Sequence, residues 1–187
     1  MKLLKSLTGL SLILCFFACS NSEKNNLIAK NKLGLIDQNT KISELKGILA
    51  EDSLSQKEAD RFNRNQDLEV YSSKDSLILV IEPRVYNDST STIKEIQVLG
   101  SRFKSESGLS SQSKFGEIYE NYKISNIQNS INSIILTIED IGAYIVIDKK
   151  HLPSELRFDN DAKIESNQIP DDAPVKYFWL RFTEDAE

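Results

Sequence analysis

The chain has 187 residues, of which 28 are acidic and 23 basic, so its net charge at neutral pH is −5. This length is sufficient to bury one hydrophobic core. The acidic balance excludes a nucleic-acid partner, because like charges repel. The sequence also lacks a basic stretch interleaved with aromatic residues, which would indicate binding to a phosphate backbone.

Residues 1–18 have the features of a secretory signal peptide. Lys2 and Lys5 give a positive start, and residues 7–18 (LTGLSLILCFFA) form an apolar stretch ending in Ala18. About twelve apolar residues are too few to span a hydrocarbon core of roughly 30 Å. We predict that residues 1–18 are removed, which leaves 21 basic and 28 acidic residues and a net charge of −7.

The two cysteines of the chain, Cys15 and Cys19, indicate which kind of signal peptide this is. Cleavage after Ala18 discards Cys15 and leaves Cys19 unpaired, which is a chemical liability in an exported chain. The junction resembles the cleavage site of bacterial lipoproteins, although Phe16 and Phe17 depart from that pattern. The resemblance implies that the thiol of Cys19 is lipidated with two or three acyl chains, enough for stable membrane anchoring. The alternative is an ordinary secreted protein with a free thiol.

Residues 19–30 are predicted to form the acylated cysteine and a flexible tether, because residues 20–30 (SNSEKNNLIAK) are polar and lack periodicity. Through the same resemblance, Ser20 implies delivery to the outer membrane. The tether has one acid, Glu23, rather than an acidic run typical of surface export. We therefore expect a body that faces the periplasm, with a surface-facing orientation as the alternative.

Two later stretches, residues 34–49 and 108–122, resemble each other. The matching segments are Gly34-Leu35 with Gly108-Leu109, Thr40-Lys41-Ile42 with Ser113-Lys114-Phe115, and Glu44-Leu45 with Glu117-Ile118. Each stretch is predicted to begin a short amphipathic helix, with Thr40 or Ser113 as its N-cap.

Three strand-like segments follow each predicted helix, because short β-branched and apolar runs alternate with turn residues. They are residues 67–73, 76–82 and 91–99, then 132–140, 143–149 and 175–182, with an extra short strand over 163–166. The apolar run 77–81 predicts a central strand covered on both faces. The order of one helix followed by three strands thus occurs twice, in unit 31–102 and in unit 103–187. This order predicts an α+β fold: an antiparallel sheet, continuous or split into two adjacent sheets, with short helices on one face.

This element order and the two helix starts resemble tandem α/β lipoprotein domains. Such domains include the SmpA/OmlA type of the outer-membrane β-barrel assembly machinery and β-lactamase-inhibitor-like proteins. With the lipid anchor, the resemblance implies a non-catalytic binding or scaffold module of the cell envelope. The inhibitor-like members imply an alternative, a hydrolase inhibitor that uses an acidic loop such as residues 139–142 or 159–161.

Few side chains favour catalysis, and we expect neither an enzyme nor a cofactor. His151 is the only histidine and is predicted to lie on a loop. Without a second histidine or a thiol, Cys–His nucleophiles and His/Cys zinc sites are absent. Residues 159–164 lack the later ligands and the glycine of a calcium loop. Glu139, Asp140 and Asp148 surround one predicted hairpin and leave a carboxylate-dependent hydrolase as the third alternative.

The last predicted strand carries the candidate partner-binding residues. Tyr177, Trp179 and Arg181 alternate with Phe178 and Leu180, so one of these two sets faces the core. Aromatic side chains beside an arginine are typical of binding hot spots. If exposed, these three residues would contact an envelope protein or a glycan. The alternative is a central strand covered on both faces.

Overall fold

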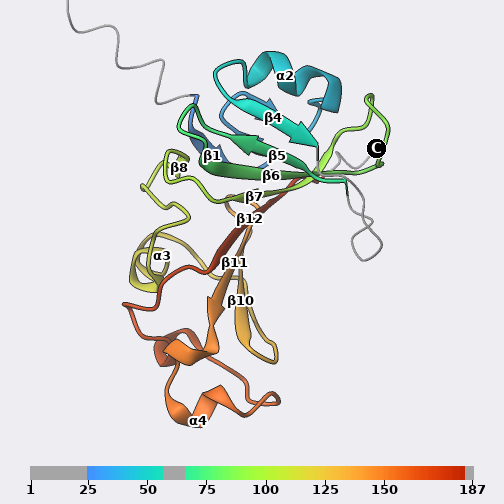
Figure 1. Cartoon of the computed structure of the whole chain (residues 1–187). Helices are drawn as coiled ribbons and strands as arrows, with labels where there is room; N and C mark the ends of the chain where they lie inside the picture. The colour runs from blue at the N-terminus through green and yellow to red at the C-terminus, as the bar shows by residue number, and fades with distance from the viewer. Residues whose placement is uncertain (1–24, 57–65, 184–187) are drawn as a thin grey trace, which may run out of the picture.

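The computed structural model describes residues 25–56 and 66–183. The predicted signal peptide (1–18) and Cys19 lie outside the described residues. Within them the chain is mixed α/β, mostly strands in two sheets with a few short helices, in agreement with the expected α+β class (Figure 1). In this part of the chain no helix is long and apolar enough to cross a membrane.

The main sheet is antiparallel, has eight strands and follows the order β4-β5-β6-β7-β12-β11-β10-β9. Its strands are β4 (Ser53–Gln56), β5 (Leu68–Tyr71), β6 (Leu77–Pro83), β7 (Ile93–Val98), β9 (Asn126–Asn129), β10 (Ser133–Ile138), β11 (Ala143–Asp148) and β12 (Tyr177–Arg181). β4 and β10, near the two ends of this sheet, run in different directions in Figure 1, as the twist of a wide sheet requires. All six strands predicted for the two halves lie in this one sheet. The sequence prediction missed β4 and β9, because these polar edge strands carry no apolar run.

A second, smaller sheet has the order β3-β2-β1-β8. Its strands are β1 (Leu27–Ala29), β2 (Lys32–Leu33), β3 (Ile36–Asp37) and β8 (Lys104–Ser105), and β1 pairs in parallel with β8. The predicted tether over residues 19–30 is therefore too long at its C-terminal end. Ile28 is 1% exposed and belongs to the core, so burial of a short apolar segment orders residues that the polar composition assigned to a linker.

One short helical segment lies within each of the two matching sequence stretches. These segments are a 3₁₀ turn η1 (Ile42–Glu44) continued by α2 (Leu45–Ile48), and α3 (Phe115–Asn121). Each begins one residue later than predicted, with Lys41 or Lys114 as its N-cap. The amides of these two lysines donate to the carboxylates of Glu44 and Glu117, each at 2.8 Å. The glutamate thus satisfies the orphan amide at each helix start.

The predicted caps, Thr40 and Ser113, have a different role. Their hydroxyl oxygens accept hydrogen bonds from the amides of Asp37 (2.9 Å) and Ser110 (3.2 Å), three residues earlier in the chain. Both residues are buried, so each closes the turn that leads into the helix instead of capping the helix itself.

The core lies against one face of the main sheet. Every second residue of β10 and β11 is buried, and the residues between them are partly exposed. Leu79 and Ile81 are fully buried, whereas Val80 between them is partly exposed. Ile78, beside the irregularity in the β5–β6 pairing, is buried as well, but from Leu79 onward only one face of β6 is covered. The prediction that the whole of strand 77–81 is covered on both faces is therefore wrong.

The connection between β11 and β12 contains three single turns: η2 (Lys149–His151), α4 (Ser154–Arg157) and η3 (Ser166–Gln168). The extra strand predicted over residues 163–166 is wrong. Ile164 is buried there without a neighbouring strand, and the amide of Glu165 donates to the side chain of Gln168 at 2.9 Å, which starts η3. The apolar residue in this segment, Ile164, suggested a strand, but it enters the core as the single buried residue of the segment.

Lys149 is a buried lysine, 2% exposed, that holds two loops together. Its ammonium group donates to the carbonyl oxygens of Ser130 (3.2 Å) and Asp159 (3.4 Å) and to the side-chain oxygen of Asn160 (3.0 Å). A buried ammonium group is tolerated only when its donors are satisfied in this way. Lys149 therefore fixes the β9–β10 turn against residues 159–160.

The start and the end of the described chain also meet. The amide of Thr183 donates to Oδ1 of Asn31 at 3.0 Å, and Nδ2 of Asn31 donates to Oγ1 of Thr183 at 3.0 Å. The turn between β1 and β2 is thereby joined to the residues just after β12.

We predict that Lys149→Met lowers the free energy of unfolding by about 2 kcal/mol, because three acceptors lose their donor. Urea unfolding followed by circular dichroism measures this change. Lys150→Met, at the exposed neighbouring lysine, is the control and should change stability by less than about 0.5 kcal/mol. Equal effects of the two substitutions would contradict the role of Lys149 in joining the β9–β10 turn to residues 159–160.

Candidate functional site: an uncovered sheet face

The face of the main sheet that points away from the core is the candidate site, and we call it the open face. On the four central strands its residues are all partly or fully exposed. They are Val80 and Glu82 (β6), Glu95 and Gln97 (β7), Tyr177, Trp179 and Arg181 (β12), and Tyr144 and Val146 (β11). A sheet with one face on the core and one in solvent is common among antiparallel sheets.

Three aromatic side chains, Tyr144, Tyr177 and Trp179, lie on this face and form what we call the aromatic group. Tyr144 on β11 pairs directly with Trp179 on β12. Tyr177 lies on the same face of β12, two residues before Trp179. Tyr177 is 44% exposed, whereas Trp179 is partly buried. Of the two alternatives for the last strand, the structure shows the uncovered one, although β12 is central in the sheet.

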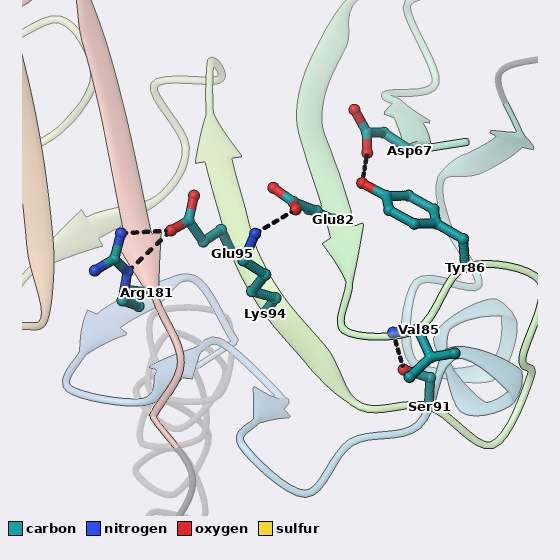
Figure 2. Close-up of polar contacts among 8 residues, drawn as sticks. All are labelled: Asp67, Glu82, Val85, Tyr86, Ser91, Lys94, Glu95 and Arg181. Atoms are coloured by element: carbon teal, nitrogen blue, oxygen red, sulfur yellow. Dashed lines mark hydrogen bonds and ion pairs between the residues drawn. The ribbon is translucent and has the colours of Figure 1, made fainter. Parts of the chain in front are cut away.

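Arg181 is held between a carboxylate and an aromatic ring. Its Nε and Nη2 contact the Oε1 atom of Glu95 at 2.9 and 2.8 Å. Its guanidinium carbon lies 4.4 Å from the ring centroid of Tyr144, and its Nη1 donates to the Tyr144 hydroxyl at 3.1 Å. Glu95 and Arg181 are drawn in Figure 2, on neighbouring strands. These contacts fix a planar hydrogen-bonding group at one side of the aromatic group.

An irregularity in β7 extends this arrangement. The register between β6 and β7 shifts at Glu82 and Pro83, so that β7 has the extra residue Lys94. Lys94 reaches the carboxylate of Glu82 at 2.6 Å while Glu95 reaches Arg181, and Figure 2 shows the resulting row of alternating charges. The hydrogen bond to Glu82 is the main cause of the raised pKa of Lys94. A β-bulge of this kind redirects side chains on a strand.

The row ends at Tyr86, whose hydroxyl donates to Asp67 at 3.2 Å (Figure 2). Burial, followed by the charges of Asp67 and Glu82, raises the pKa of Tyr86 well above its ordinary value. The Tyr86 hydroxyl thus serves as a hydrogen-bond donor to Asp67. Ser91 supports the same turn, because its hydroxyl accepts from the amide of Val85 at 2.9 Å.

At the other side of the aromatic group, Lys176 contacts Asp148 at 3.1 Å and lies 5.5 Å from the ring centroid of Tyr177. The pKa of Asp148 is lowered, first by the hydrogen bond from the amide of Lys150 and then by that from Lys176. Lys176 and Asp148 thus form a closed ion pair beside Tyr177.

The candidate carboxylates do not come together. Glu139 and Asp140 are exposed at the turn before β11, and Asp148 is the last residue of β11. The strand length between these ends, about 17 Å, is far more than the separation of paired glycosidase carboxylates. The convergence considered for a carboxylate-dependent hydrolase is therefore not found.

The remaining candidate residues lie apart from the open face. Asp159 accepts from the amides of Asp161 (2.9 Å) and Ala162 (3.0 Å), which makes it a turn residue in the loop considered for an inhibitor. His151 ends η2 and is partly buried. In the described part of the chain, no group of three His, Cys, Asp or Glu side chains is placed to hold a metal ion.

Two hollows also lie away from the open face. The larger, about 510 Å³, is lined mainly by residues of the small sheet and α2, including Leu33, Ile48 and Phe103. The smaller, about 270 Å³, is lined by Ile42, Leu68 and others on the core side of the main sheet.

The sequence pointed to Tyr177, Trp179 and Arg181 but missed Tyr144, Glu95 and Gln97. The signal for Tyr144 was present, because strict alternation in AYIVID places Tyr144 and Val146 opposite the apolar set. What was lacking was the strand pairing that puts β11 and β7 on either side of β12.

No protein-family model matches the chain, and neither does any curated protein. Among solved structures the chain is similar to the crystal structure of the uncharacterized protein yfeY from Escherichia coli. The TM-score is 0.48 and the identity 18%, over 83% of this chain and 97% of that chain. No function is transferred from this similarity.

We predict that Asp148→Asn changes the pH dependence of stability. Folding lowers the pKa of Asp148 from an unfolded value of about 3.9, so its contribution is complete above about pH 5 and is lost as the pH falls through the folded pKa. The variant should be less stable by on the order of 1 kcal/mol at pH 7 and by much less at pH 2. Urea unfolding across this range measures the difference, and Asp140→Asn at the exposed hairpin is the control. A difference that is the same at every pH would rule out this carboxylate as the cause.

Proposed function

We propose that this protein is a lipid-anchored, non-catalytic binding module of the bacterial outer membrane, and that the open face is its partner site. The observation that supports the proposal is the aromatic group, which lies partly or fully exposed on two central strands and is flanked by ion pairs. Tyrosine, tryptophan and arginine are the residue types that dominate binding energy at interfaces. The favoured orientation is toward the periplasm.

The anchor part of the proposal rests on the sequence of residues 1–19. Only residues 20–24 separate Cys19 from the first described residue, Asn25. Even a fully extended chain of this length reaches roughly 20 Å. With acyl chains on Cys19, the folded body would therefore lie close to the bilayer surface.

We also propose that the body arose by duplication of one helix-and-strands unit, with four strands in each copy instead of the three expected. Matching contacts at the two helix starts support this proposal. The amides of Ile42 and Phe115 donate to the carbonyl oxygens of Ser91 and Ala173, each at 2.9 Å.

The next residue of each helix repeats the contact. The amides of Ser43 and Gly116 donate to the carbonyl oxygens of Ser89 and Asp171, again each at 2.9 Å. Each helix start is thus joined to the segment that precedes the last strand of its own unit. The strand order, in which β7 and β12 are central neighbours, also supports two units facing each other.

The two proposed units differ on the open face. With the units matched as above, Tyr177 and Trp179 correspond to Glu95 and Gln97. Tyr144, which pairs with Trp179, corresponds to Val80, which pairs with Gln97. At these matched positions the aromatic residues all belong to the second unit, which favours a specialised binding role for that part of the face over a uniform structural one.

To test the anchor, we predict that Cys19→Ser abolishes acylation and releases the protein from the membrane. Mass spectrometry of the purified protein and fractionation of cells measure the two effects. Cys15→Ser is the matched control, because Cys15 is expected to leave with the signal peptide. A wild-type protein without acyl mass would refute the anchor.

To test the partner site, a photoreactive benzoylphenylalanine is placed at Tyr177 in growing cells. We expect discrete adducts from this position and none of the same size from Tyr119, a 55% exposed tyrosine on α3. Protease or lysozyme digestion then shows whether the captured partner is protein or glycan. Identical adduct patterns from the two positions, or none from Tyr177, would count against the open face.

A further inference from the structure

We propose that the partner of the open face is a neutral glycan chain, which lies across β11, β12 and β7 and stacks on the aromatic group. This inference rests on the proposed function, since it names the chemical class of ligand for the same site. Three features of the face carry it: the kind of apolar surface present, the pairing of its charges, and its shape.

The apolar surface of the open face is aromatic. Seven large hydrophobic residues are well exposed in the described part of the chain: Leu35, Val85, Leu99, Tyr119, Ile131, Phe158 and Tyr177. Of these, only Tyr177 belongs to the aromatic group. The aliphatic residues near it are less exposed than Tyr177, because Val80 and Val146 are only partly exposed and Leu99, directly after β7, is 37% exposed. Aromatic rings with polar edges instead suit the C–H faces and hydroxyl groups of sugar rings.

The charges near the aromatic group are paired within the face. Arg181 pairs with Glu95, Lys94 with Glu82 and Lys176 with Asp148, at 2.8, 2.6 and 3.1 Å. A face on which three cations are matched by three carboxylates gives little attraction to a polyanion. The same pairing holds planar donors and acceptors in fixed positions, where they can bind neutral hydroxyl groups.

The shape of the face suits an extended ligand. Tyr177 and Trp179 are two residues apart on one strand, which separates them by about 7 Å, and Tyr144 lies on the adjacent strand about 5 Å away. The rings are therefore spread over the area of two or more neighbouring sugar rings. Residues of three neighbouring strands contribute to this surface, so it offers a platform on which an extended chain can lie.

The chain contains a single tryptophan, Trp179, which makes it a direct reporter of binding. The acylated protein in detergent micelles is titrated with a chitin hexasaccharide and with cellohexaose, and the emission of Trp179 is recorded. We expect a saturable change with at least one of these probes. Isothermal titration calorimetry gives the affinity independently of fluorescence.

Substitutions locate the binding. Tyr144→Ala and Tyr177→Ala should each weaken binding about tenfold through loss of a stacking ring. Phe158→Ala is the matched control, because Phe158 is 87% exposed but lies in the loop after α4, away from the open face. Circular dichroism confirms that each variant is folded. If Tyr144→Ala fails to fold, the affinity of Tyr177→Ala alone tests whether the glycan binds at the aromatic group.

Three results would overturn the inference: no binding of either neutral probe at millimolar concentration, equal losses in Tyr177→Ala and Phe158→Ala, or tighter binding of heparin than of both neutral probes. Its failure is distinguishable from that of the proposed function. A protein adduct captured at Tyr177 without glycan binding would leave the binding module intact and exclude the glycan. Absence of both would remove the two proposals together.

Discussion

The pairing of β7 with β12 is the interaction on which the rest of the structure depends. These strands come from opposite halves of the chain and meet in the middle of the main sheet, with Phe178 opposite Val98 and Leu180 opposite Ile96. All four side chains are at most 2% exposed. Without this pairing, each half would be a four-stranded sheet with an apolar strand at its edge, which is prone to aggregation.

The same pairing builds the candidate site. It places Trp179 opposite Gln97 and Arg181 opposite Glu95, so residues from the two halves of the chain contact each other on the open face. Neither half could form this surface alone. The bulge at Lys94 adds a second carboxylate–cation contact beside the first. The polar side of the face is thus a direct product of strand register.

The parts of the fold that the sequence predicted well are those that depend on local patterns. Alternation in residues 177–182 separated Phe178 and Leu180 from the exposed set, and the two helix starts were located to within one residue. The parts that it missed depend on distant partners. Leu27–Ala29 is a strand because β8 lies beside it, and Tyr144 joins the site because β11 neighbours β12. A single sequence does not contain these pairings in readable form.

The contact between Asn31 and Thr183 has a consequence for how the molecule is oriented. A lipid on Cys19 would hold the first strand near the bilayer, and this contact brings the residues after β12 to the same end. A reporter fused behind Thr183 would then sit beside the lipid headgroups, while the region around β10 and α4 would extend toward the opposite side (Figure 1). The loops around α4 would thus face whatever lies farther from the membrane.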